Sequence, residues 1–227
     1  MLACDSRWLR LLDVAVGANS PGHARLCSVV CVSTEKRESL RPDGWSSLTS
    51  RAQRLSEALV APLGRRWTHT QAVASRAASA EAAVDALERQ NLVAAAWLHD
   101  IGYSPEIGHT RFHPLDGARY LRDEGWPEII VNLVAHHSGA RFEAKQRGLA
   151  DELAEFPFPD GPLLDALALA DLTTGPSGEP LTYDERIAEI LRRYPEDDPV
   201  HQAWLEAGQV LRESVRRAEA RMASGSA

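Results

Sequence analysis

Two helical segments that are apolar on every side constrain the fold of this chain more than any other feature. Residues 91–101 read NLVAAAWLHDI, and residues 163–172 read LLDALALADL. A helix that is apolar all round has to be buried, so both segments are expected inside a helical bundle. Each carries a carboxylate near its end, Asp100 and Asp171, and burying an unpaired charge is costly. The sequence therefore predicts chemistry where these two helices end.

The chain from Ser47 onward follows helical spacing, with no alternating strand pattern and no internal repeat. Pro114 is suited to open one helix, Gly125 to end it, and Pro127 to open the next. The expected helical segments cover residues 48–59, 69–80, 81–89, 91–101, 115–125, 128–138, 140–155, 163–172, 183–194 and 198–222. These segments predict an all-α domain over residues 47–222 that ends in an amphipathic helix.

Residues 1–46 differ from the rest because no helical period persists there. They contain the three cysteines of the chain, an odd number that argues against a disulfide framework. His23, Cys27 and Cys31 are spaced four apart, which suits one face of a zinc-binding helix. The lack of periodicity favours a flexible extension instead, or a functional chain that starts downstream.

Composition excludes several classes of protein. The 227 residues carry a net charge of −7, unlike the basic surface of a general nucleic-acid binder. No apolar run approaches the roughly 20 residues that a membrane span needs, and the N-terminal residues do not resemble a secretory signal. The sequence therefore predicts a cytoplasmic protein that contacts neither membranes nor nucleic acids in general.

Histidines complete the pattern begun by the two carboxylates. Eight occur in the chain, and six of them fall between positions 69 and 137. Each has an ordinary interpretation when taken alone, such as a helix cap or a solvent-facing residue at a helix end. Together they form an ordered set on successive helices, of the residue types that bind zinc, iron or manganese. The candidate metal ligands are His69, His99, Asp100, His113, His136, His137 and Asp171.

In this order the residues resemble the HD phosphohydrolase superfamily, over roughly residues 48–194. His69, the pair His99–Asp100 and Asp171 match its defining pattern. The resemblance implies a helical bundle with one or two divalent ions in a central cleft, of manganese, iron, cobalt, magnesium or zinc. It implies that Asp100 bridges two sites, the first completed by His69, His99 and Asp171, the second by His113 with His136 or His137.

The stretches HPLDGARYL (113–121) and AHHSG (135–139) look like the multi-metal branch of that superfamily. This branch includes HD-GYP phosphodiesterases and dinucleoside tetraphosphate hydrolases. Two departures stand out. Tyr103 occupies a position where relatives often have lysine, and no Gly-Tyr-Pro element follows the histidine pair. Hydrolysis of cyclic di-GMP is therefore not expected.

Substrate contacts are expected from cations near the histidines, namely Arg111, Arg141 and Lys145. Arg141 and Lys145 are four apart, so one helical face can present both, although Lys145 equally suits a solvated surface. His109 is a candidate general acid for the leaving group, and Asp100 is the candidate catalytic ligand. Hydroxyl contacts are assigned to Ser138 and Thr173.

The expected function is hydrolysis of a phosphate ester or anhydride in a small phosphorylated metabolite, such as a nucleotide, by metal-activated hydroxide. Two alternatives use the same resemblance. One is a di-iron oxygenase of the HD type, similar to inositol oxygenase. The other is a nucleotide-binding regulatory module that signals through the C-terminal helix. The apolar side of that helix, with Trp204, also makes a homodimer a candidate assembly.

Overall fold

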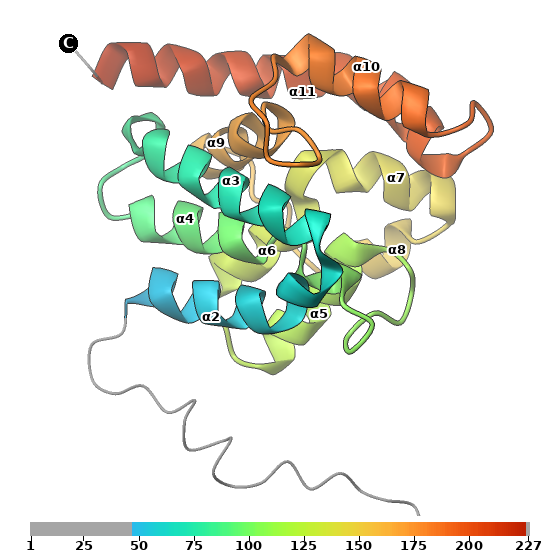
Figure 1. Cartoon of the computed structure of the whole chain (residues 1–227), viewed down its shortest axis with the longest axis horizontal. Coiled ribbons are helices and arrows are strands. Elements are labelled where there is room, and N and C mark those ends of the chain that lie inside the picture. The colour runs from blue at the N-terminus through green and yellow to red at the C-terminus, as the bar shows by residue number, and fades with distance from the viewer. Residues whose placement is uncertain (1–46, 226–227) are drawn as a thin grey trace, which may run out of the picture. The chain divides into compact units, whose positions relative to one another are not determined.

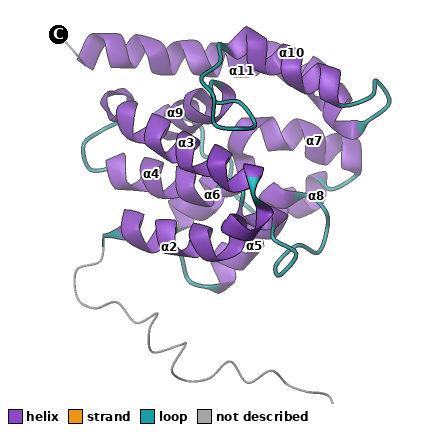
Figure 2. Cartoon of the chain, in the orientation of Figure 1, coloured by secondary structure: helices purple, strands orange, loops and turns teal. Residues whose placement is uncertain are grey.

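The computed structural model describes residues 47–225, where every regular element is a helix (Figures 1 and 2). The prediction of an all-α fold is therefore confirmed for this part of the chain. The α-helices are α2 (Leu48–Val60), α3 (Arg65–Ser79), α4 (Arg89–Leu98), α5 (His113–Asp123), α6 (Glu128–His136), α7 (Ala140–Arg147), α8 (Ala150–Leu153), α9 (Pro162–Leu172), α10 (Tyr183–Arg193) and α11 (Pro199–Gly225). Four short 3₁₀ turns join them: η1 (Ala61–Leu63), η2 (Glu81–Ala83), η3 (Ile101–Tyr103) and η4 (His137–Gly139).

Two expectations for the first 46 residues, a flexible extension and a zinc-binding helix face, lie outside the described residues. Within the described helices, none is long and apolar enough to cross a lipid bilayer.

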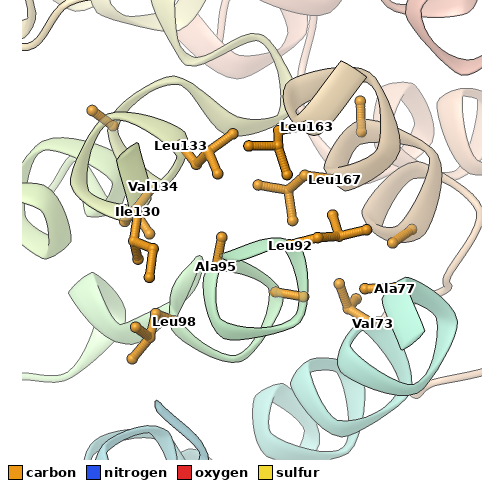
Figure 3. Close-up of a cluster of buried hydrophobic side chains, with 14 of the residues drawn as sticks. Val73, Ala77, Leu92, Ala95, Leu98, Ile130, Leu133, Val134, Leu163 and Leu167 are labelled. Carbon is orange, nitrogen blue, oxygen red and sulfur yellow. The ribbon is translucent and has the colours of Figure 1, made fainter. Parts of the chain in front are cut away.

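Helix α4 forms the centre of the described bundle, as its apolar sequence predicts. It packs against α2, α3, α6 and α9. Figure 3 shows Leu92, Ala95 and Leu98 of α4 among side chains from α3, α6 and α9. Each fully buried leucine contributes about 2 kcal/mol through removal of apolar surface from water. This packing fixes the end of α4, where His99 and Asp100 follow.

The second apolar helix, α9, is held between α3, α4 and α11. Its one charged residue besides Asp171 is Asp165, which is buried. Asp165 accepts hydrogen bonds from Arg217 Nε at 2.9 Å and from Arg221 Nη1 at 2.8 Å, both on α11. These two arginines compensate the buried charge and fasten α11 along α9.

Several helices begin or end a few residues away from the sequence-based expectation, and one expected helix is absent. Helix α3 begins at Arg65 rather than His69, because Gly64 adopts a conformation open to glycine (φ 60°, ψ −107°) that separates η1 from a new helix there. The sequence predicts a helix over residues 81–89, but the structure has the short turn η2 there and α4 begins only at Arg89, since Val84 is extended (φ −132°, ψ 162°). Helix α11 runs to Gly225, beyond the expected end at residue 222.

A backbone contact sets the spacing between η3 and α5. A Cβ atom on Gly102 would lie 2.0 Å from the carbonyl oxygen of His113 and 2.7 Å from the amide nitrogen of Gly117. Only glycine permits such an approach. The turn that follows Asp100 is therefore held directly against the first turn of α5, which begins with His113.

Candidate metal centre

Six of the seven predicted ligands converge on one region, in two groups. The first group comprises His69 of α3, His99 at the end of α4 and Asp171 near the end of α9. The second comprises Asp100, His113 at the start of α5 and His137 at the start of η4. Within each group the potential ligand atoms lie within 4.8 Å of one another. Segments a hundred positions apart in sequence thus meet at the ends of the two buried helices.

In the first group the imidazole nitrogens face one carboxylate oxygen. His69 Nε2 lies 3.1 Å from Asp171 Oδ1, and His99 Nε2 lies 4.0 Å from the same oxygen. All three residues are buried. This group is therefore shielded from bulk water.

In the second group two imidazoles meet. His113 Nε2 lies 3.1 Å from His137 Nε2 and 3.4 Å from Asp100 Oδ1. The other oxygen of Asp100, Oδ2, is 3.4 Å from His99 Nε2 in the first group. Asp100 therefore presents one oxygen to each group, as expected for a bridging carboxylate.

Backbone hydrogen bonds fix the orientation of three of the imidazole rings. In each ring Nδ1 donates to a backbone carbonyl: His69 to Gly175 (2.9 Å), His99 to Ala96 (2.8 Å) and His137 to Val134 (2.7 Å). A carbonyl only accepts, so Nδ1 carries the proton and Nε2 of the neutral ring keeps its lone pair. Such an outer hydrogen bond is typical of histidines that bind metal through the other nitrogen.

The buried Nε2 of His99 has no hydrogen-bond partner within residues 47–225. A buried nitrogen without a partner is unusual, because it forfeits the hydrogen bond it would make to water. Here it faces the two carboxylates. In the neutral ring this nitrogen has a lone pair, which a proton or a metal cation can accept.

The electrostatics also favour a cation. Burial opposes ionisation of Asp100 and Asp171, but neighbouring His99, Arg66 and His69 hold the pKa of both carboxyls well below the usual range. Burial lowers the pKa of His113 and His137, so both rings are neutral.

His99 shows the same demand for positive charge. Burial lowers its pKa, but the charges of Asp100 and Asp171 outweigh burial and raise the pKa to about 9. The position between two ionised carboxylates thus stabilises positive charge. Divalent cations fit this donor set, which combines imidazole nitrogen with carboxylate oxygen.

Ser138 supports the first group from the adjacent turn. Its hydroxyl donates to Asp171 Oδ2. Ser138 adopts φ 47° and Gly139 φ 77°, a left-handed pair that bends the chain sharply after α6. A left-handed conformation is strained for serine, and such strain is concentrated at functional sites. Ser138, predicted as a hydroxyl contact for the substrate, thus uses its hydroxyl within the chain, on the candidate ligand Asp171.

Arg66 supports the second group. Its Nη1 donates to Asp100 Oδ2 at 2.9 Å. The guanidinium also lies 3.7 Å from the centre of the Tyr103 ring, which stacks on His113 at 3.9 Å. Tyr103, at the position where relatives often have lysine, therefore packs between a cation and a ligand.

His136 lies outside both groups, so its assignment as a ligand is corrected. Adjacent residues on a helix diverge by about 100°, and α6 ends between the two histidines. His136 Nε2 donates to the Phe156 carbonyl at 2.8 Å, and the ring packs edge-on against Phe158. Of the pair, the structure brings only His137 to the other ligands.

The remaining predicted residues divide between the cavity and the surface. A cavity of about 200 Å³ opens beside the ligands, and Arg111 lines it. His109 is exposed and does not line it, so the structure gives no support for a general acid there.

Three further assignments are corrected. Arg141 lies over the rings of Phe142 and Phe158, away from the cavity, and Lys145 pairs with Glu206 at 2.9 Å. Thr173 is tied to the Leu169 carbonyl and to Arg76. Arg141 and Lys145 are four apart on α7 as predicted, but α7 turns its alanine face inward and presents these cations to solvent.

Sequence reasoning missed four arginines that line the same cavity: Arg66, Arg147, Arg186 and Arg193. A signal existed for three of them. Arg66 precedes His69 by three residues on one helix, and Arg186 and Arg193 are seven apart, which places them on one face of α10. The cavity thus combines acidic ligands at its base with cations in its wall.

The chain matches the family model described as HD domain over residues 66–189, more than half of its length, and belongs to that family. HD domains are typically metal-dependent phosphohydrolases, which agrees with the donor set. No curated protein and no solved structure matches the chain.

Proposed function

We propose that this protein hydrolyses a phosphate ester or anhydride of a small phosphorylated metabolite. The observation that carries the proposal is the pair of donor groups joined by Asp100, at the base of a cavity whose wall contains arginines. Carboxylates alone would repel a phosphate. Together with metal-binding imidazoles and with guanidinium groups, they form a site that can bind a phosphate.

The chain offers places for two divalent cations. His69, His99 and Asp171 would hold one, and His113 and His137 the other, with Asp100 between them. Bound there, such cations would lower the pKa of water to supply hydroxide at neutral pH and would neutralise charge on phosphate oxygens.

Arg111 is the strongest candidate for orienting the phosphate. It lines the cavity two residues before His113, and within residues 47–225 it makes no ion pair. Its φ of 63° is a strained value for a residue other than glycine, and such strain is concentrated at functional sites. A guanidinium offers several donors in a fixed plane that match phosphate oxygens.

Arg147 and Arg66 line the same cavity, and each forms an ion pair. Arg147 is held by Glu143 at 2.6 Å, and Arg66 by Asp100 at 2.9 Å. Because these pairs fix the guanidinium planes in advance, little ordering is needed when charge develops on the phosphate. Arg66 also keeps Asp100 ionised, and hence ready to act as a ligand.

The experiment is a phosphate-release screen on chelated protein reloaded separately with manganese, magnesium, cobalt, iron or zinc, under anaerobic conditions. We expect phosphate release from at least one class of nucleotide or sugar phosphate with at least one metal. The adjacent histidines provide a matched pair: His137→Ala abolishes release and lowers metal content, whereas His136→Ala preserves both.

Two outcomes would overturn the proposal. A requirement for iron and molecular oxygen, without phosphate release, would assign the site to an oxygenase. Tight nucleotide binding without turnover at every metal would assign it to a regulatory module. Equal effects of the two histidine substitutions would contradict the ligand assignment itself.

A further inference from the structure

A second cavity, of about 170 Å³, adjoins the metal centre and is rich in arginine. Its lining includes Arg65, Arg66, Arg186 and Arg193, and among the described residues no carboxylate lines it. We term it the arginine pocket. Three of these arginines, together with His69, also line the first cavity, so the two cavities have a common wall.

The positive charge of the arginine pocket is only partly compensated. Arg186 and Arg193 share a single carboxylate, Glu189, at 2.6 Å and 2.9 Å. Arg66 is committed to Asp100 of the metal centre. Arg65 is exposed and forms no ion pair within the described part of the chain. The arginine pocket is therefore lined by four arginines and, among the described residues, by no carboxylate.

Arg186 provides an independent indication of a ligand. The residue is 8% exposed, and its Nε has no hydrogen-bond partner within residues 47–225. A buried, charged donor without an acceptor is costly unless something else accepts from it. Because Arg186 lines the pocket, an anion bound there would lie beside its guanidinium group and add to the single carboxylate, Glu189, with which it pairs.

The start of α3 adds to the positive potential. Arg65 and Arg66 are its first two residues, no side chain caps them, and no acidic residue occurs in the first turn. The free amide groups and the helix dipole of this 15-residue helix favour an anion at this end.

We propose that the arginine pocket binds a second phosphate group of the substrate, linked to the one attacked at the metal centre. The preferred substrate is then a diphosphate or longer chain, such as a nucleoside diphosphate, rather than a monophosphate. This inference rests on the proposed function. The proposal specifies a diphosphate because the two cavities share a wall. A ligand that reaches both cavities must carry two anionic groups close together. A volume of 170 Å³ holds a phosphate group, since a water molecule takes about 30 Å³.

The test uses Arg65, because it lines the arginine pocket and not the first cavity. The matched control is Arg89→Gln, which changes an exposed arginine at the first position of another helix, α4. Binding of inorganic phosphate and of methylenediphosphonate, whose P–C–P bridge resists hydrolysis, is measured by calorimetry on the full, metal-loaded chain.

We expect wild-type protein to bind methylenediphosphonate at least about tenfold more tightly than phosphate. Arg65→Gln should weaken diphosphonate binding about five- to tenfold, as expected for one charge-assisted hydrogen bond, and change phosphate binding less than about twofold. Arg89→Gln should change neither. Equal affinity for the two probes, or equal effects of the two substitutions, would overturn the proposal.

Kinetics separate this inference from the proposed function. Turnover of monophosphates and diphosphates with equal kcat/KM, unaffected by Arg65→Gln, would refute the arginine pocket while leaving the hydrolase intact. Absence of phosphate release from every substrate, with Arg65-dependent diphosphonate binding, would refute the hydrolase and retain the pocket.

Discussion

The two histidines of the His136–His137 pair face two different cavities, and the comparison shows what distinguishes the candidate metal centre from an ordinary hollow. The cavity beside His137 measures about 200 Å³ and contains Asp100 and Asp171. The hollow beside His136 is larger, about 470 Å³, but its lining is mostly apolar, with Phe156 and Phe158. Histidine and space are common to both, so the carboxylates make the difference.

The way each ring is anchored reinforces this difference. His137 uses Nδ1 for a backbone carbonyl, which leaves Nε2 directed at His113. His136 uses Nε2 for the Phe156 carbonyl, and its Nδ1 is buried. The outer hydrogen bond of His137 therefore turns its free nitrogen toward the other candidate ligands, whereas that of His136 does not.

Replacing a carboxylate of the metal centre should have the largest effect. Asp171→Asn keeps the shape of the side chain but removes the charge that faces His69 and His99, so we expect loss of one bound metal and a fall in activity on the order of 10³-fold. Elemental analysis measures the metal content, and a phosphate-release assay measures the activity. The control is Asp165→Asn on the same helix, which should cost about 2 kcal/mol of stability through its bonds to α11 but leave the metal content unchanged.

Ser138 tests the outer support of the same group. Ser138→Ala removes the hydrogen bond to Asp171, and we expect about 10- to 100-fold weaker metal binding. Ser138→Gly removes the same hydroxyl but suits the left-handed conformation, so it should bind metal as weakly while unfolding at a higher temperature than the alanine variant. Metal titration and thermal denaturation separate the two effects. Undiminished metal affinity in both variants would show that the hydroxyl is irrelevant.

His136 tests the hollow that lacks carboxylates. His136→Ala leaves the Phe156 carbonyl without its donor, which should lower the free energy of unfolding by about 1–3 kcal/mol. Metal content should stay at the wild-type value, because the ring contributes no atom to either donor group. Denaturant unfolding and elemental analysis measure the two quantities. A drop in metal content without loss of stability would reverse the comparison.

The smallest effects are expected at the cations of α7. Arg141→Ala removes ring contacts with Phe142 and Phe158, worth about 0.5–1 kcal/mol at an exposed site. Lys145→Ala removes an exposed ion pair with Glu206 that contributes about 0–1 kcal/mol. Neither substitution should change kcat/KM by more than about twofold, since both side chains lie outside the cavity. A tenfold loss of kcat/KM would show that these two side chains contact the substrate after all.

The helices α4 and α9 could be predicted because an all-round apolar sequence allows only burial. The same reasoning located His99, Asp100 and Asp171, since a charged or polar residue after such a helix requires partners. The direction of the turn after α6, at Ser138 and Gly139, could not be predicted in this way. Ser138 gives no strong signal for a left-handed conformation, so the sequence offered both His136 and His137 as ligands.

The arginines of the cavity were missed for a different reason. Apolar periodicity marks the buried side of a helix but not its first turn, so the start of α3 was placed at His69 and Arg66 was left outside it. The role of Arg141 and Lys145 was misjudged because spacing shows that two residues share a face, not which way that face turns.

Gly102 has a consequence for how such a protein can diverge. Because main chain rests on main chain between η3 and α5, the separation of Asp100 and His113 does not depend on which side chains fill the surrounding core. Substitutions that enlarge or shrink core residues can accumulate without changing the distance between Asp100 and His113. Core residues can therefore vary in size because Gly102, where no side chain fits, keeps the distance between η3 and α5 constant.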